Sequence, residues 1–185
     1  MINIREAITG DINKIAEIHE FCWQEVYSFM PESILKNRDA DFRKKQWLYW
    51  FEKTPLDEKL YVVTVDQTIV GFCCCKPCED PDAPDGAGEM HAAYVMPEYR
   101  GGIVGPVMIV NMGEFLLQRG YRSFVLWAFR QNRVRMWYGQ IGFKSFVQRN
   151  RSIAGQGIPE IGYVCHDTNT LISKLRKQIA VRQRS

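Results

Sequence analysis

The chain has 185 residues, close to the size of a single domain, since domains average roughly 150 residues. Its 46% hydrophobic and 24% charged residues are typical of a globular protein and exclude a disordered or fibrous chain. The 24 basic and 21 acidic side chains leave a net charge of +3, which gives no reason to expect a nucleic-acid partner.

Short strands alternate with helices along the chain. Alternating apolar residues indicate the strands, and apolar residues at helical spacing indicate the helices. Asp66-Gln67 is expected to form a hairpin turn, Thr54-Pro55 to end the second helical region, and 77–88 to form a loop. In chain order the expected elements are a strand at 2–5, helices at 12–26 and 31–53, strands at 60–65, 69–75 and 90–95, a helix at 106–119, a strand at 123–129, a short helix between Asn132 and Gly142, strands at 143–147 and 158–165, and a terminal helix from Asp167 or Thr168.

This order predicts an α/β (α+β) protein with a mixed sheet. The early hairpins indicate antiparallel pairs, and the strand–helix–strand unit at 90–129 indicates a right-handed parallel crossover. No repeat and no long linker divides the chain. We therefore expect one domain at 1–166, with the basic helix at 167–185 appended to it.

The most informative segment is 89–106, where a strand runs through glycines into a helix N-terminus. Free amides and the positive end of the helix dipole suit a phosphate there, and Arg100 adds a positive charge. The spacing matches neither a Walker loop nor a dinucleotide fingerprint. Without further motifs, the pattern fits equally well a turn that merely starts a helix.

Four pieces of sequence occur in a recognisable order. They are PEYRGGIVG at 97–105, LWA at 126–128 with Asn132 beyond it, the pair Trp137-Tyr138, and Gly142-Phe143. Together they resemble the GNAT superfamily of N-acetyltransferases. The resemblance implies a mostly antiparallel central sheet of about seven strands, flanked by helices and splayed between the fourth and fifth strands. It also implies transfer of an acetyl group from acetyl-CoA to a primary amine by direct attack, with no metal.

The resemblance further implies a cofactor site. The strand around Tyr94, Val95 and Met96 would pair its backbone with the pantetheine arm, and Asn132 would hydrogen-bond the same arm. The pyrophosphate would be held by the loop residues Arg100, Gly101, Gly102, Ile103, Val104, Gly105 and Pro106. Asn132 is also a good helix cap, and the two roles are compatible.

The catalytic candidates are Tyr138, Glu89 and His91. Tyr138 matches the tyrosine that protonates the leaving CoA thiolate in relatives, although a tyrosine on a short amphipathic helix also suits a core. Glu89 is the first candidate for the base, directly or through water, and a solvated acid is its alternative. His91 lies two residues on, on the same strand face, and is the second candidate; its alternative is a structural histidine.

Two residues depart from the family pattern. Ile103 occupies the position of the first motif glycine, and Pro106 has no N–H to offer the pyrophosphate. Gly102 is expected to supply the flexibility instead. These departures keep open a second reading, a weak or inactive GNAT-like module that binds acyl-CoA or a protein partner.

Cysteine and charge features give the remaining expectations. The segment with Cys73, Cys74, Cys75 and Cys78 lacks a second metal-ligand pair, so buried thiols are favoured over a metal or redox site. His19, on the apolar stripe of its helix, is expected to pack in the core. With no export signal and no apolar run of about 18 residues, we expect a cytoplasmic protein without a membrane partner, monomeric or homodimeric.

Two charged segments are open to more than one reading. The acidic loop at 79–85 would attract a cationic amine such as a polyamine, or would only aid solubility. The basic tail would contact an acidic partner, or would be a solvated helix whose cations suit its own dipole. Its basic residues are Lys174, Arg176, Lys177, Arg182 and Arg184.

Overall fold

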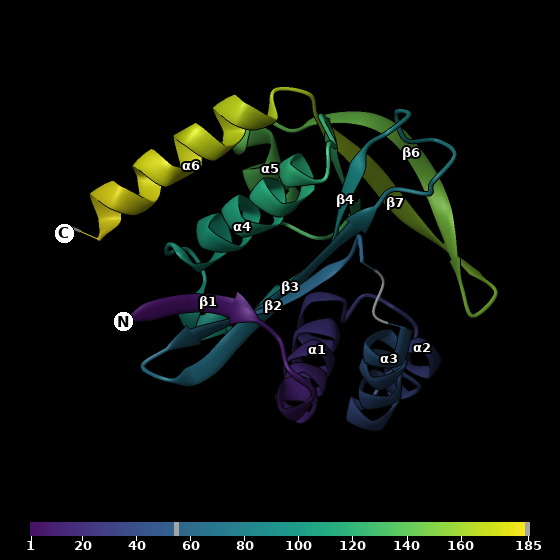
Figure 1. Cartoon of the computed structure of the whole chain (residues 1–185). Helices are drawn as coiled ribbons and strands as arrows, with labels where there is room; N and C mark the ends of the chain where they lie inside the picture. The colour runs from purple at the N-terminus through teal and green to yellow at the C-terminus, as the bar shows by residue number, and fades with distance from the viewer. Residues whose placement is uncertain (54–55, 184–185) are drawn as a thin grey trace.

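The computed structural model describes residues 1–53 and 56–183, and within them seven strands form one sheet with helices on both faces (Figure 1). The order of the strands is β1-β2-β3-β4-β5-β7-β6. In chain order the elements are β1 (Ile2–Glu6), a 3-10 turn (Thr9–Asp11), α1 (Ile12–Val26), α2 (Glu32–Lys36), α3 (Ala40–Lys53), β2 (Lys59–Val65), β3 (Thr68–Pro77), β4 (Gly88–Val95), a second 3-10 turn (Pro97–Tyr99), α4 (Val104–Gln118), β5 (Phe124–Phe129), α5 (Arg135–Ile141), β6 (Lys144–Ile153), β7 (Gln156–Cys165) and α6 (Thr168–Arg182).

β4 and β5 form the parallel pair of the sheet, connected through α4, and the other neighbouring strands run antiparallel. α1, α2 and α3 lie on one face, while α4, α5 and α6 lie on the other (Figure 1). This arrangement confirms the predicted fold class and the parallel crossover. It leaves the parallel pair in the middle of the sheet, where both layers of helices approach it.

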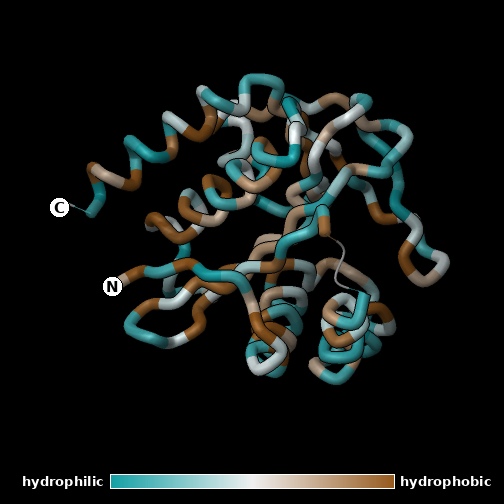
Figure 2. Tube along the Cα trace, in the orientation of Figure 1, coloured by the Kyte–Doolittle hydropathy of each residue, from teal (hydrophilic) through white to brown (hydrophobic). Residues whose placement is uncertain are grey.

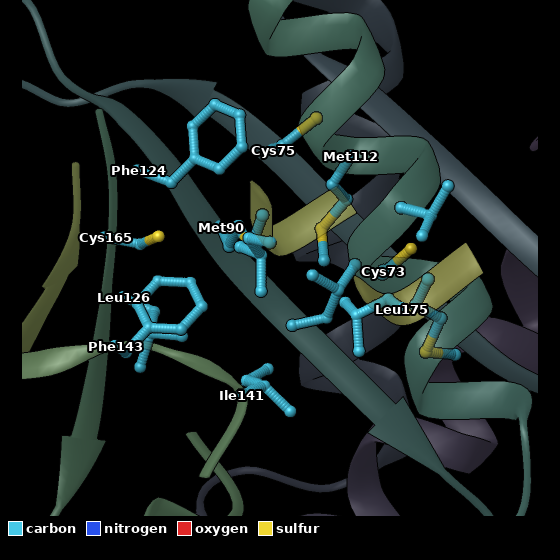
Figure 3. Close-up of a cluster of buried hydrophobic side chains, with 14 of the residues drawn as sticks. Cys73, Cys75, Met90, Met112, Phe124, Leu126, Ile141, Phe143, Cys165 and Leu175 are labelled. Carbon is cyan, nitrogen blue, oxygen red and sulfur yellow. The ribbon is translucent and has the colours of Figure 1, made fainter. Parts of the chain in front are cut away.

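The main core lies between the sheet and α4. Figure 3 shows the sulfur atoms of Cys73 and Cys75 on this side, among Met112, Leu175 and other apolar side chains. Cys74 points to the opposite face and packs with α1 and α3. Burial raises the pKa of Cys73 and Cys74 well above the ordinary thiol value, which favours the protonated, unreactive form.

The β2–β3 hairpin forms as expected, although its turn contains no glycine. Asp66 and Gln67 both adopt positive φ, +48° and +69°, as a two-residue turn of the type I′ class requires. β6 and β7 form a longer hairpin than predicted, because polar residues such as Asn150 continue β6 beyond the apolar run and pair with β7. Ala154 and Gly155 turn it, again with positive φ.

The predicted helix at 31–53 is two helices, because the polar segment Asn37–Asp39 interrupts it. The Asp39 carboxylate accepts a hydrogen bond from the Phe42 backbone N–H at 2.8 Å, which caps the start of α3. The expected end at Thr54-Pro55 lies outside the described residues. Figure 2 shows that hydrophilic and hydrophobic residues alternate along these helices.

α6 packs against α4 rather than standing free of the domain. Leu171, Ile172 and Leu175 are buried in the same cluster as the α4 side chains. Its cations are also engaged, since Arg176 pairs with Glu114 of α4 and Lys174 Nζ donates to the Gln140 carbonyl at 2.8 Å. α6 is therefore placed beside the open end of the β4–β5 pair.

Candidate functional site

A pocket of about 990 Å³ opens where β4 and β5 separate. The two strands pair only at Gly88–Phe124 and Glu89–Val125, so beyond Glu89 the facing edges of both strands have no strand partner within the described residues. This is the predicted splay. The pocket draws its lining from both strands, from the end of α1, and from α4, α5 and α6.

A β-bulge in β4 lies within the pocket wall. Cys74 of β3 lies opposite Ala92, and Cys75 lies opposite Met90, so His91 is the additional residue. The bulge reverses the alternation of side chains along β4, and residues from His91 to Val95 line the pocket. The sequence alone does not place the bulge at His91, because its position depends on the register with β3.

Glu89 and His91 form a hydrogen-bonded pair, with 2.6 Å between Glu89 Oε1 and His91 Nδ1. His91 lines the pocket, whereas Glu89 is only 8% exposed and lies behind it. Burial raises the pKa of Glu89, but the hydrogen bond and charge of His91, with Lys76 nearby, outweigh this effect and hold the pKa below its ordinary value. The carboxylate is thus placed to orient the imidazole.

Tyr138 and Asn132 line the same pocket from the segment after β5. Burial raises the pKa of Tyr138, so its hydroxyl stays protonated at neutral pH. The Asn132 side chain accepts a hydrogen bond from the Val134 backbone N–H at 3.1 Å, and its amide group donates to the Tyr27 hydroxyl at 3.4 Å. Asn132 therefore stabilises the start of the α5 segment while facing the pocket.

The glycine loop reaches the pocket through Arg100, Gly101, Gly102, Gly105 and Pro106. Gly101, with φ +75°, is the residue in the left-handed region, so the expectation that Gly102 supplies this freedom was wrong. Pro106 lies in the first turn of α4, where backbone N–H groups have no intrahelical partner, and it fits there without cost to the helix.

Three of the predicted cofactor residues lie away from the pocket wall. Ile103 and Val104 are buried in the fold, and Ile103 has an ordinary φ of −97°. Met96 packs on the α1 side, and its N–H donates to the Val70 carbonyl at 2.9 Å. The Ile103 departure is therefore accommodated without backbone strain.

Arg100 does not turn its side chain toward the expected pyrophosphate position. Its Nη1 and Nη2 atoms donate to the two carboxylate oxygens of Glu25 in α1, at 2.9 and 2.6 Å, and its Nε donates to the Val95 carbonyl at 2.8 Å. The Glu25 carboxylate neutralises its charge. Arg100 thereby connects the loop to α1, because a bidentate guanidinium–carboxylate pair holds both groups in fixed geometry.

α6 contributes side chains that the sequence reading left out of the site. Lys174, Gln178 and Arg182 line the pocket. Arg182 Nη1 donates to the carbonyls of Gly101 and Gly102, at 2.6 and 2.9 Å. The spacing of these three polar residues, four apart, places them on one helix face and could have indicated their shared role.

The other singled-out residues have structural partners. His19 is buried, and its Nδ1 accepts a hydrogen bond from Trp47 Nε1 at 3.2 Å, as expected of a core histidine. In the acidic loop, Arg149 pairs with both Asp80 and Asp82. Within residues 1–53 and 56–183, no group of three or more His, Cys, Asp or Glu side chains is placed to hold a metal ion. None of the helices in these ranges has the length and apolarity needed to cross a membrane.

Comparison with known proteins gives a consistent result. The sequence profile of the acetyltransferase (GNAT) family matches residues 12–143. An uncharacterized N-acetyltransferase of Bacillus subtilis (strain 168), YuaI, is 25% identical over 179 residues, which cover 96% of this chain and 100% of the relative.

Solved structures show the same fold. PaiA N-acetyltransferase from Thermoplasma acidophilum, in complex with coenzyme A, has 20% identity and a TM-score of 0.62, covering 86% of this chain and 98% of that one. YncA from Salmonella typhimurium, with acetyl-CoA, has 17% identity and a TM-score of 0.67, covering 89% and 93%.

The splayed parallel pair, with a glycine turn and a helix at its open end, is part of a fold that this chain shares with solved acetyltransferases. The chain belongs to the acetyltransferase (GNAT) family. It is therefore a member of a family of acetyltransferases.

Proposed function

We propose that this chain transfers the acetyl group of acetyl-CoA to a primary amine by direct attack, without a covalent enzyme intermediate. The observation that carries the proposal is the pocket at the β4–β5 splay, which places His91, with Glu89 behind it, and a protonated Tyr138 in one lining. When bound, acetyl-CoA supplies an activated acyl group.

The pocket fits such a donor. Its size suits a long, thin ligand, and its wall combines the unpaired edge of β4, the glycine loop and the cations of α6. We assign the pantetheine contacts to the β4 backbone at Tyr94 and Val95 and to Asn132. The phosphates are assigned to the Gly101–Gly102 turn and the start of α4, with Lys174 and Arg182 supplying positive charge.

For each proton transfer of the reaction, the pocket offers a side chain in a suitable protonation state. An amine attacks only in its neutral form, so a base must remove a proton from the ammonium. His91 faces the pocket and is oriented by Glu89, so we assign it as the base and Glu89 as its positioning residue. Tyr138, whose pKa is raised by burial, holds the proton that the leaving thiolate takes.

The first test is isothermal titration with acetyl-CoA, followed by an assay of CoA release with a panel of amines. We expect micromolar binding at one site per chain. We also expect Tyr138→Phe to lower kcat by about 10²-fold or more with an unchanged Kd for acetyl-CoA, which is the effect of losing a general acid. Tyr121→Phe, outside the pocket, is the matched control.

Two outcomes would contradict the proposal. A Tyr138→Phe variant with full activity would remove the tyrosine from the mechanism. Binding of acetyl-CoA without CoA release for any amine would favour a binding module instead.

A further inference from the structure

Two arginines lie against the same indole ring on the α1–α3 side of the sheet. The guanidinium carbon of Arg43 is 4.5 Å from the centroid of the Trp23 ring, and that of Arg38 is 5.1 Å from it. Arg43 is only 2% exposed, whereas Arg38 is half-buried and reaches the surface. The two side chains therefore form a positively charged site in which Arg43 is buried and Arg38 is accessible from the surface.

Neither guanidinium has a carboxylate partner within the described residues. Arg43 Nη1 donates to the neutral amide of Gln46 at 3.0 Å, and its Nε and Nη2 atoms are buried without a hydrogen-bond partner there. Several other arginines have a carboxylate partner, as Arg100 has Glu25 and Arg149 has Asp80. Buried polar groups in proteins are rarely left unsatisfied, so this exception calls for a ligand or a strong structural reason.

The charge on Arg43 is retained despite its burial. Burial, with a contribution from the neighbouring charge of Arg38, lowers its pKa to about 10, which leaves the group protonated at neutral pH. A buried cation without a counter-ion destabilises the protein, and an anionic ligand would relieve this cost. The charge of Glu20 acts on Arg43, but no carboxylate of the described residues forms an ion pair with it, so an anion from outside would supply the missing partner.

Neither arginine is in the pocket lining, but aromatic side chains connect them to it. Trp23 packs edge-on against Tyr27, with ring centroids 4.6 Å apart, and Tyr27 lines the pocket. The His19 ring also lies beside Trp23, with ring centroids 6.3 Å apart, and beside Tyr94, with centroids 4.6 Å apart. Tyr94 lines the same pocket as His91. The two arginines and the proposed base therefore belong to the same region of the molecule.

We propose that the acceptor of this enzyme carries a carboxylate in addition to its amine, and that Arg38 and Arg43 bind that carboxylate. This inference rests on the proposed function and names its substrate class, a small amino acid. A guanidinium matches the two oxygens of a carboxylate in geometry and charge. Nearby cations also lower the pKa of an ammonium group, which favours the neutral amine that attack requires.

The same arrangement disfavours a polyamine. Two uncompensated cations repel a polycationic acceptor, and the acidic loop that suggested one has Asp80 and Asp82 occupied by Arg149. The local charge thus selects for an acid-bearing amine.

The test uses L-amino acids, each paired with the amine that remains when its carboxylate is removed. We expect kcat/KM of the wild-type chain to favour at least one amino acid over its amine by about 100-fold. Arg43→Met and Arg38→Met should each reduce that preference by about tenfold or more, the loss expected for a charged hydrogen bond. Their Kd for acetyl-CoA should be unchanged. Arg119→Met, paired with Asp57 at the end of α4, is the matched control.

A binding measurement covers the case in which no acceptor in the panel reacts. The same amino acids should raise the thermal unfolding midpoint of the wild-type chain bound to CoA, but not that of Arg38→Met. Arg43→Met should unfold at the wild-type temperature or above, because it removes a buried charge without a partner. A wild-type chain that prefers the amines, or shows no shift with any amino acid, overturns the inference while acetyl-CoA binding and turnover still test the proposed function separately.

Discussion

At the scale of single residues, the pair Glu89–His91 decides how the site can handle a proton. The two side chains were predicted as alternative bases, but the bulge in β4 gives them different positions. His91 faces the pocket and Glu89 lies behind it, joined by a 2.6 Å hydrogen bond. We therefore propose that His91 meets the substrate and that Glu89 holds the imidazole in place.

This division of roles predicts different kinetic effects. His91→Asn should lower kcat by about 10²-fold or more, because it removes the proposed base. Glu89→Gln should lower kcat less, because the imidazole remains in the pocket. Steady-state rates of the two variants check both expectations, with the exposed His166→Asn as control. The reverse pattern would make Glu89 the base.

At the scale of elements, α6 and the glycine loop act on the same part of the pocket. Arg182 donates to two carbonyls of the loop, and Lys174 and Gln178 continue the lining along the helix. The loop has lost one amide donor at Pro106, and its arginine is committed to Glu25. We propose that α6, the helix beyond the last strand, compensates in part for both changes in the binding of CoA.

Removal of the Arg182 charge should therefore weaken CoA binding. We expect Arg182→Gln to raise the Kd by about tenfold, since hydrogen bonds to charged groups contribute about 1.5–3 kcal/mol. The effect should shrink at high salt. Arg176→Gln removes the same charge from the same helix, but Arg176 pairs with Glu114 instead of lining the pocket. If titration calorimetry gave the same increase in the Kd for CoA in both variants, Arg182 would have no specific role in CoA binding.

At the scale of the whole molecule, several ionisable groups make stability depend on pH in one direction. The Arg5 side chain lowers the pKa of Asp11, and Arg149 lowers that of Asp80. Burial lowers the pKa of His19. In each case the unfolded chain binds more protons than the folded chain as the pH falls, so acidification favours unfolding.

Urea unfolding at several pH values measures how the free energy of unfolding depends on pH. Stability should fall first below about pH 6.5, where unfolded histidine is protonated, and again below about pH 4, through the carboxylates. His19→Gln keeps an acceptor for Trp47 but cannot be protonated, so it should flatten the first decrease. His166→Gln, an exposed control, should not. If the free energy of unfolding of His19→Gln fell with pH as steeply as that of the wild-type chain, His19 would not be the cause of the first decrease.

The sequence by itself determined the features that depend on neighbours along the chain. Periodicity located the strands and helices, the Asp66-Gln67 turn was recognisable without glycine, and the order of short motifs identified the family. Tyr138 and Asn132, which both line the pocket, were predicted because their positions follow the motif along the chain. Boundaries were missed where polar segments decided them, as at Asn37–Asp39 between α2 and α3.

Only the tertiary structure decided which distant side chains meet. Arg100 contacts Glu25, 75 positions away, and Arg182 contacts Gly101, 81 positions away. The lack of a partner for Arg43 likewise appears only when all its neighbours are in place. The physical reason is that backbone propensity and motif spacing act locally. Pairing, burial and charge compensation depend on how the helices pack on the sheet, and those contacts set the chemistry of the pocket.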